Sequence, residues 1–275
     1  MTEAMSELPI RDDLRGRSAY GAPQIDVPVL LNVNENPYPP SAAVVEAIAQ
    51  AVGRAAQGVN RYPDRECVGL RSALATYLAK REGLSFSTDA IWPANGSNEV
   101  MQQLLQLFGG PDKKLVTFDP TYSMYEDYCR NTFTQYLSVA RNEDFTIDKE
   151  VIDNALALSP DIIVLTSPNN PTGAVYSEAS LRAINTLCAQ HGLYHFSDEA
   201  YEYFTYEGVK HFSPASITGA MKHTLSFYSM SKNYGMASWR VGYVVFPANL
   251  FDAMNKVQDT NLICAPMPSQ LLALE

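Results

Sequence analysis

The chain has 275 residues, of which 46% are hydrophobic and 18% are charged. These proportions are typical of a folded globular protein and exclude a largely disordered chain. The 20 Lys and Arg residues against 30 Asp and Glu residues give a net charge of −10, which repels nucleic acid and anionic membrane surfaces over long distances. We therefore expect neither as a partner, and any anionic ligand has to be held by local groups.

The N-terminal segment is polar. Glu3, Glu7 and Arg11 lie where a secretory signal would carry an apolar stretch. The longest apolar runs, such as residues 161–165, are too short to span a bilayer. We therefore predict a cytoplasmic protein with an N-terminal arm, residues 1–40, and one large domain, residues 41–275, because no repeat or Gly/Ser linker interrupts the chain.

Helical and strand patterns then alternate along the chain. A first helix is expected after Pro40 with Ser41 as its N-cap, and a second at residues 70–78. Short apolar runs bounded by turn residues predict five strands, at residues 90–93, 114–118, 162–165, 193–196 and 225–228. This alternation predicts a three-layer α/β/α fold with a mostly parallel sheet, in which ligands bind at the carboxyl ends of the strands.

The chain ends at residues 271–275 inside a helical pattern, with no capping glycine or proline after it, so we expect the large domain to be truncated. The cysteines are widely spaced and form no C-x-x-C pair, which argues against a disulfide framework and a zinc site. We predict buried thiols and no metal ion; the cysteines are Cys67, Cys129, Cys188 and Cys264.

A lysine, two serines and an arginine follow the fifth predicted strand. The segment begins Ser229-Met-Ser231-Lys232 and continues to Arg240 and Gly242. A single lysine after a strand is usually just solvated. Here two hydroxyl donors and a guanidinium accompany the amine, a group that suits a phosphate beside a reactive lysine. A nearby cation also makes the lysine lose its proton more easily, as a Schiff-base nucleophile requires.

Three further polar clusters adjoin predicted strands or helices. Residues 198–201, Asp-Glu-Ala-Tyr, follow the fourth predicted strand, and the aspartate alone is typical of a helix N-cap. Residues 167–173 follow the third strand and are equally consistent with a simple turn. Residues 95–99 precede an apolar helix face, and indicate either a capped helix or a phosphate site at a helix N-terminus.

The Lys232 segment resembles the S-x-S-K-x-x-x-x-x-x-x-R-x-G motif of fold type I, class I/II aminotransferases, which depend on pyridoxal 5′-phosphate (PLP), and residues 168–173 resemble their P-x-N-P-T-G signature. The resemblance covers about residues 30–270. It implies that Lys232 holds PLP in a Schiff base and later moves a proton between the substrate Cα and the cofactor C4′. Asp198 would lie under the pyridine nitrogen and keep it protonated, while Tyr201 and Asn170 would bind O3′.

The same resemblance assigns the remaining contacts. Tyr122 matches the aromatic residue that stacks on the pyridine ring. Tyr62 matches a residue that reaches across a dimer to the neighbouring cofactor phosphate, which implies a homodimer, and Tyr38 one that lies near the substrate. The cofactor phosphate would be bound by Ser97, Asn98, Ser229, Ser231 and Arg240.

The resemblance divides over the substrate. Residues 31–41 and 60–71 are similar to histidinol-phosphate aminotransferases, whereas the Lys232 segment and residues 211–216 and 258–264 are more similar to the aspartate and aromatic branch. The implied reaction moves an amino group from histidinol phosphate, or from an amino acid, to 2-oxoglutarate in amino acid biosynthesis. The alternative is an aspartate or aromatic amino acid aminotransferase.

Two other classes share the motifs. Phosphothreonine-type decarboxylases and some C–S lyases use the same cofactor, and the orientation of the substrate decides which Cα bond breaks. A PLP-binding regulatory domain is the non-enzyme alternative, but it needs a DNA-binding partner that the short arm and acidic charge disfavour. The family's substrate-binding arginine lies in a C-terminal small domain absent from this sequence, so we expect the fragment to bind cofactor weakly and turn over poorly.

Overall fold

The computed structural model describes residues 10–19 and 21–275 and divides the chain into two compact units, one ending at Asn34 and one spanning Glu35–Glu275. The first unit contains a short 3-10 helix, η1 (Asp12–Leu14). Within it the Asn32 side-chain amide donates to the Pro23 carbonyl at 2.8 Å. The boundary that the sequence suggests at residue 40 stays a prediction.

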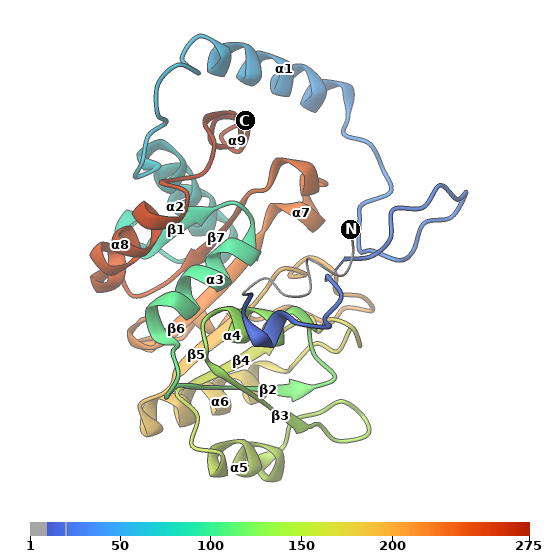
Figure 1. Cartoon of the computed structure of the whole chain (residues 1–275), viewed down its shortest axis with the longest axis vertical. Coiled ribbons are helices and arrows are strands. Elements are labelled where there is room, and N and C mark those ends of the chain that lie inside the picture. The colour runs from blue at the N-terminus through green and yellow to red at the C-terminus, as the bar shows by residue number, and fades with distance from the viewer. Residues whose placement is uncertain (1–9, 20) are drawn as a thin grey trace. The chain divides into compact units, whose positions relative to one another are not determined.

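The second unit is built around one mixed sheet (Figure 1). Among the described residues seven strands form it, in the spatial order β1-β7-β6-β5-β4-β2-β3. β7 runs antiparallel to β1 and β6, and the other neighbouring strands are parallel, which confirms the predicted mostly parallel sheet. The strands are β1 (Ile91–Ala94), β2 (Lys114–Asp119), β3 (Gln135–Ala140), β4 (Ile162–Thr166), β5 (Tyr194–Asp198), β6 (Thr224–Ser229) and β7 (Gly242–Val245).

Helices cover both faces of this sheet. The core between the sheet and α3, α4 and α8 lies on one face, and α2, α5 and α6 pack on the other. This arrangement confirms the predicted three-layer fold. The helices of the described chain are α1 (Ala42–Ala56), α2 (Val68–Glu82), α3 (Ser97–Phe108), α4 (Met124–Asn131), α5 (Lys149–Ala157), α6 (Glu178–His191), α7 (Met230–Asn233), α8 (Phe251–Asn261) and α9 (Met267–Leu272).

The central strands are apolar throughout because both of their faces are buried. In β4, Ile162 and Val164 pack toward α3, while Ile163 and Leu165 pack toward α5 and α6, and all four are at most 1% exposed. Successive side chains of a strand point to opposite faces, so a strand between two helical layers needs apolar residues at every position. The continuous apolar run of β4 therefore makes this strand easy to predict from the sequence.

Two strands were not predicted. β3 is an edge strand with exposed and half-exposed side chains, and its polar Ser138 interrupts an apolar run. β7 has four residues and begins at Gly242, within the Lys232 motif. By contrast, the Ser41 prediction is confirmed, since its hydroxyl accepts from the Val44 N–H at 3.4 Å.

All four cysteines are buried, as predicted, and their thiols are free. Burial raises the pKa of Cys67, Cys129 and Cys188 to about 12, so these thiols stay protonated near neutral pH. None of the helices in the described parts of the chain is long and apolar enough to cross a membrane.

Candidate functional site

Polar residues gather where the parallel strands β4, β5 and β6 end. Thr166 at the end of β4 pairs with Asp198 at the end of β5, and Asp198 pairs in turn with Phe227 of β6. β6 then ends at Ser229, where α7 begins. Three of the clusters singled out in the sequence therefore meet at one edge of the sheet, as expected for a ligand site in this architecture.

Lys232 lies in α7, the short helix after β6, and its side chain is half-buried. The Ser229 hydroxyl caps this helix by accepting from the Ser231 N–H at 3.2 Å. Burial lowers the pKa of the Lys232 amine, Glu35 opposes the shift, and the Arg240 guanidinium adds to it. The amine thus loses its proton at a lower pH than an exposed lysine, which favours nucleophilic attack.

Arg240 folds back toward the start of α3. Its Nη1 lies 3.4 Å from the Ser231 hydroxyl, and a Cβ atom added to Gly96 would lie 2.6 Å from its Nη2. A Cβ atom on Gly242 would collide with the backbone nitrogen of Ser97. Both glycines are therefore required for the guanidinium and β7 to approach the N-terminus of α3. The unpaired N–H groups and positive dipole end of this helix, beside Arg240, suit an anion.

Asn98 is also in the first turn of α3, but its side chain points to α4. Its amide nitrogen lies 3.8 Å from the Met124 sulfur. Of the residues predicted to bind phosphate, Ser97, Ser231 and Arg240 are thus brought together at the start of α3, whereas the side chain of Asn98 has another contact.

Asp198 is buried at the end of β5, with 8% of its surface exposed. Its carboxylate accepts from the Tyr125 hydroxyl at 2.7 Å and from the Ala200 N–H at 3.2 Å. Burial raises the pKa of Asp198, and these two hydrogen bonds oppose the rise. The Tyr125 hydroxyl is also 2.7 Å from the Thr166 hydroxyl. A buried carboxylate held in this way fits a cationic ring nitrogen.

Sequence reasoning missed Tyr125. Tyr125 is fully buried in α4, three residues after Tyr122, and their rings meet edge to face with centroids 5.5 Å apart. The signal that was available is the closeness of the two tyrosines in the sequence: Tyr122 directly precedes Ser123, the N-cap of α4, and Tyr125 is the second residue of the helix.

Asn170 and Tyr201 come from different turns and meet. The Asn170 amide donates to the Tyr201 hydroxyl at 3.4 Å. The Asn170 turn is fixed by its neighbour, because the Asn169 side-chain oxygen accepts from the Thr172 N–H at 3.1 Å and from its hydroxyl at 2.7 Å. Residues 167–173 do form a turn, and that turn presents Asn170 to Tyr201.

Tyr38 and Tyr62 lie on the surface. Their exposed fractions are 79% and 82%. The role predicted for Tyr62 needs a second chain, and that for Tyr38 needs a substrate. Both roles stay predictions.

Residues 26–274 match the family model described as aminotransferase class I and II. The chain belongs to the aminotransferase class I and II family. Its members depend on PLP, which agrees with the cofactor that the sequence motifs imply.

Curated relatives of this aminotransferase-family chain include Histidinol-phosphate aminotransferase 3 of Burkholderia lata, 46% identical over 256 residues that cover 93% of this chain and 68% of the relative. The histidinol-phosphate aminotransferase of Bifidobacterium adolescentis is 44% identical, covering 91% of this chain and 66% of the relative. The chain therefore spans about two thirds of the length of the curated relatives that it matches.

Solved structures agree on the fold. The aspartate aminotransferase of Thermus thermophilus with maleate has a TM-score of 0.80 at 30% identity, covering 89% of this chain and 63% of that one. The aromatic aminotransferase of Pyrococcus horikoshii has a TM-score of 0.80 at 25% identity, covering 88% of this chain and 65% of that one. The family and fold predicted from the motifs are therefore confirmed.

Proposed function

We propose that this chain is the PLP-binding part of an aminotransferase and that its amine donor is histidinol phosphate. The observation that carries the proposal is that Lys232, Asp198 and Arg240, with the N-terminus of α3 beside Arg240, lie at one edge of the sheet. The donor is proposed from the names of the curated relatives at 42–46% identity.

The residues of the site fit the chemical groups of PLP. The N-terminus of α3 with Arg240 suits the phosphate, because the close approach at Gly96 leaves backbone N–H groups and a guanidinium side by side. Asp198 suits the ring nitrogen, Asn170 and Tyr201 suit O3′, and the ring of Tyr122 suits the face of the pyridine. The Lys232 amine suits the aldehyde group of PLP. When bound, PLP supplies an electron sink for the bonds of the substrate Cα.

The protein's own groups have distinct tasks. The Lys232 amine would hold the cofactor, and the free amine would accept the proton from the substrate Cα. Asp198, held by Tyr125, keeps the ring nitrogen protonated. This division of roles predicts ping-pong kinetics, with the keto product of the donor leaving before the acceptor keto acid enters.

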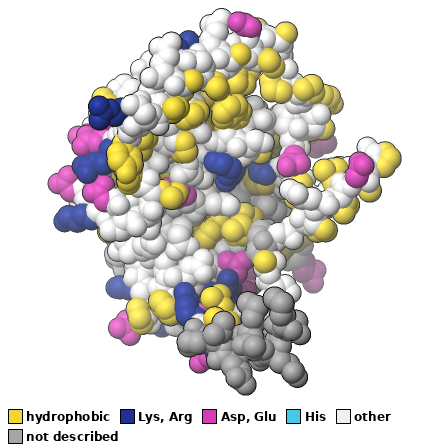
Figure 2. Space-filling model, turned by 45° about the horizontal axis from the view of Figure 1, so that its top comes forward, with side chains coloured by type: hydrophobic (Ala, Val, Ile, Leu, Met, Phe, Trp, Pro, Cys, Tyr) yellow, Lys and Arg dark blue, Asp and Glu magenta, His cyan; other side chains and the backbone are white. Residues whose placement is uncertain are grey.

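A homodimer is part of the proposal. Figure 2 shows hydrophobic side chains gathered over α1, and Val44, Val45 and Val52 of this helix are 42%, 51% and 37% exposed. Exposed apolar surface of this kind is typical of protein interfaces, and a second chain is what the role of Tyr62 requires. The acceptor 2-oxoglutarate and a cytoplasmic location are further parts of the proposal.

An absorbance titration with PLP tests the function. The wild-type protein is expected to give the band of lysine-bound PLP, and Lys232→Ala to lose it. Lys210→Ala is the matched control, because Lys210 is an exposed lysine of the same domain. Histidinol phosphate, aspartate and phenylalanine are then compared as donors, with keto product and carbon dioxide both measured. Carbon dioxide without keto product would identify a decarboxylase instead.

A further inference from the structure

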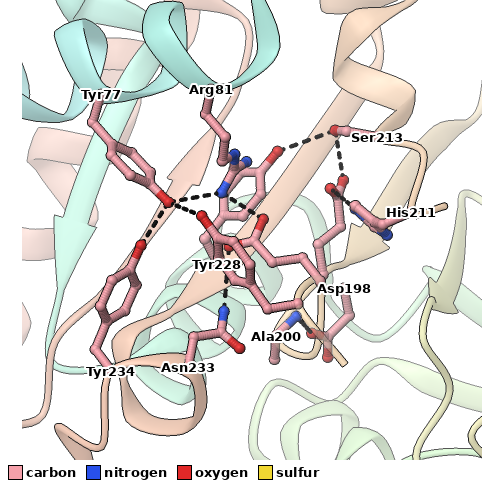
Figure 3. Close-up of polar contacts among 12 residues, drawn as sticks. Tyr77, Arg81, Asp198, Ala200, His211, Ser213, Tyr228, Asn233 and Tyr234 are labelled. Carbon is pink, nitrogen blue, oxygen red and sulfur yellow. Dashed lines mark hydrogen bonds and ion pairs between the residues drawn. The ribbon is translucent and has the colours of Figure 1, made fainter. Parts of the chain in front are cut away.

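A buried ion pair lies beside the candidate site and has no part in the chemistry proposed above (Figure 3). Arg81 of α2 lies 2.7 Å from the Glu202 carboxylate, and their side chains are 15% and 6% exposed. The rings of Tyr77, Tyr203 and Tyr228 surround the guanidinium, with centroids 5.2, 5.8 and 5.2 Å from its central carbon. The charges are therefore held in one place by aromatic packing on several sides.

The pair is linked to the residues that directly follow Lys232. The Asn233 amide donates to Glu202 at 3.4 Å. The Tyr234 hydroxyl lies 2.6 Å from the Tyr77 hydroxyl, which in turn accepts from Arg81 at 3.3 Å. Both residues after the lysine are thus tied to the pair (Figure 3).

The pair is also linked to the turn that carries Asp198 and Tyr201. Glu202 follows Tyr201 directly, and its N–H donates to the Glu199 carbonyl at 3.1 Å. The Glu199 carboxylate is fully buried and accepts from the Ser213 hydroxyl at 2.9 Å and lies 2.8 Å from a ring nitrogen of His211. Glu202, the acidic partner of the pair, is therefore part of the turn after β5.

Arg81 supplies a cation beside one of the two carboxylates of this cluster. Ligand atoms of Glu199, Glu202 and His211 lie within 4.8 Å of one another, a spacing that a metal ion could bridge, but the guanidinium already provides the cation beside Glu202. Burial raises the pKa of Glu202 to about 7, with Arg81 opposing the rise and Glu199 adding to it. Loss of either partner leaves a buried charge uncompensated, which is costly.

We propose that Arg81 and Glu202 are positioning residues, which fix the Lys232 turn against the Asp198–Tyr201 turn and so set the environment of the lysine amine. Neither side chain is assigned a contact with substrate or cofactor. The inference rests on the proposed function in taking Lys232 as the reactive lysine, but its first test needs no cofactor.

The test measures the reactivity of Lys232 in cofactor-free protein. The rate at which an amine-specific reagent labels Lys232 is followed against pH by mass spectrometry of its peptide. Glu202→Gln keeps the shape of the side chain but removes the pairing charge, and Tyr234→Phe removes only a hydroxyl. In both, a looser turn exposes the amine to water, so the midpoint of the labelling profile moves to higher pH, toward that of an ordinary lysine. The affinity for PLP is expected to fall about tenfold.

Glu178→Gln is the matched control, because Glu178 pairs with Arg182 at 2.7 Å on an exposed surface. It is expected to leave both the labelling profile and the PLP affinity unchanged. The proposal is overturned if Glu202→Gln and Tyr234→Phe lower the melting temperature but leave the Lys232 midpoint and the PLP affinity at wild-type values. If the midpoint moves as expected in a protein that does not bind PLP, the positioning role stands and the proposed function fails.

Discussion

Two carboxylates on the turn after β5 are buried to the same degree but are stabilised differently. Asp198 and Glu202 are each 8% exposed, and burial raises the pKa of both. Asp198 is held by two neutral donors, the Tyr125 hydroxyl and the Ala200 N–H, whereas Glu202 is paired with the Arg81 guanidinium. Among the described residues, Asp198 thus has no cationic side chain beside it and can pair with a cationic ligand, whereas Glu202 already has a cationic partner within the protein.

The largest expected effect on activity is at Asp198. Asp198→Asn keeps the shape and the Ala200 hydrogen bond but removes the charge beside the ring nitrogen. We expect kcat/KM to fall about 10²- to 10³-fold, the range for loss of an electrostatic group in an active site. The kcat/KM of Glu202→Gln, measured under the same steady-state conditions, is expected to fall much less. Equal losses in the two variants would remove the distinction between them.

The next effect is on stability, at Arg81. Arg81→Met leaves Glu202 and Glu199 buried without the guanidinium, and we expect a loss of about 3–5 kcal/mol in the free energy of unfolding. Urea denaturation measures it. Arg81→Met/Glu202→Gln removes both charges and is expected to recover part of the loss; a double variant as unstable as the sum of the singles would show that the two residues do not act as a pair.

Glu202 also gives a pH dependence with a defined sign. Because burial raises the pKa of Glu202 from 4.5 to about 7, the folded protein binds this proton more tightly than the unfolded chain does. Its contribution to stability is therefore fully present below pH 4.5 and is lost as the pH rises toward 7. Urea denaturation of wild type and Glu202→Gln from pH 4.5 to 8 measures the difference, which should change across this window; a constant difference would contradict it.

A smaller effect is expected at Tyr125. Tyr125→Phe leaves one oxygen of the buried Asp198 without its hydroxyl donor, at a cost of about 1–3 kcal/mol. Since the Tyr125 hydrogen bond lowers the pKa of Asp198, its loss raises that pKa further. Asp198 then becomes protonated already at a higher pH. The acidic limb of the pH profile of kcat/KM therefore moves to higher pH. An acidic limb at the wild-type pH would show that Asp198 does not control it.

The buried core and the long motifs were predictable from the sequence, for physical reasons. β4 has apolar residues on both faces, and residues 229–242 bring a lysine, serines and an arginine together within one loop. Such signals are local, because they depend on neighbours along the chain. Two strands were missed. The apolar run of the edge strand β3 is interrupted by Ser138, and β7 has only four residues and begins inside the Lys232 motif.

Contacts between distant segments were not predictable. Tyr125 reaches Asp198 across 73 positions, and Arg81 reaches Glu202 from another helix. Each is an ordinary helix residue in the sequence, and only the order of the strands brings it to its partner. The same holds for Gly96 and Gly242, whose need for a small residue arises from close approach of β7 and Arg240 to α3.

The most direct test of the central claim is to locate the covalent bond to the cofactor. The protein is incubated with PLP, treated with borohydride to make the lysine–cofactor bond permanent, digested, and its peptides are sequenced by mass spectrometry. The account predicts a pyridoxyl group on Lys232, with Lys210 and the other lysines unmodified at low PLP concentration. Modification of another lysine, or of none, would contradict it.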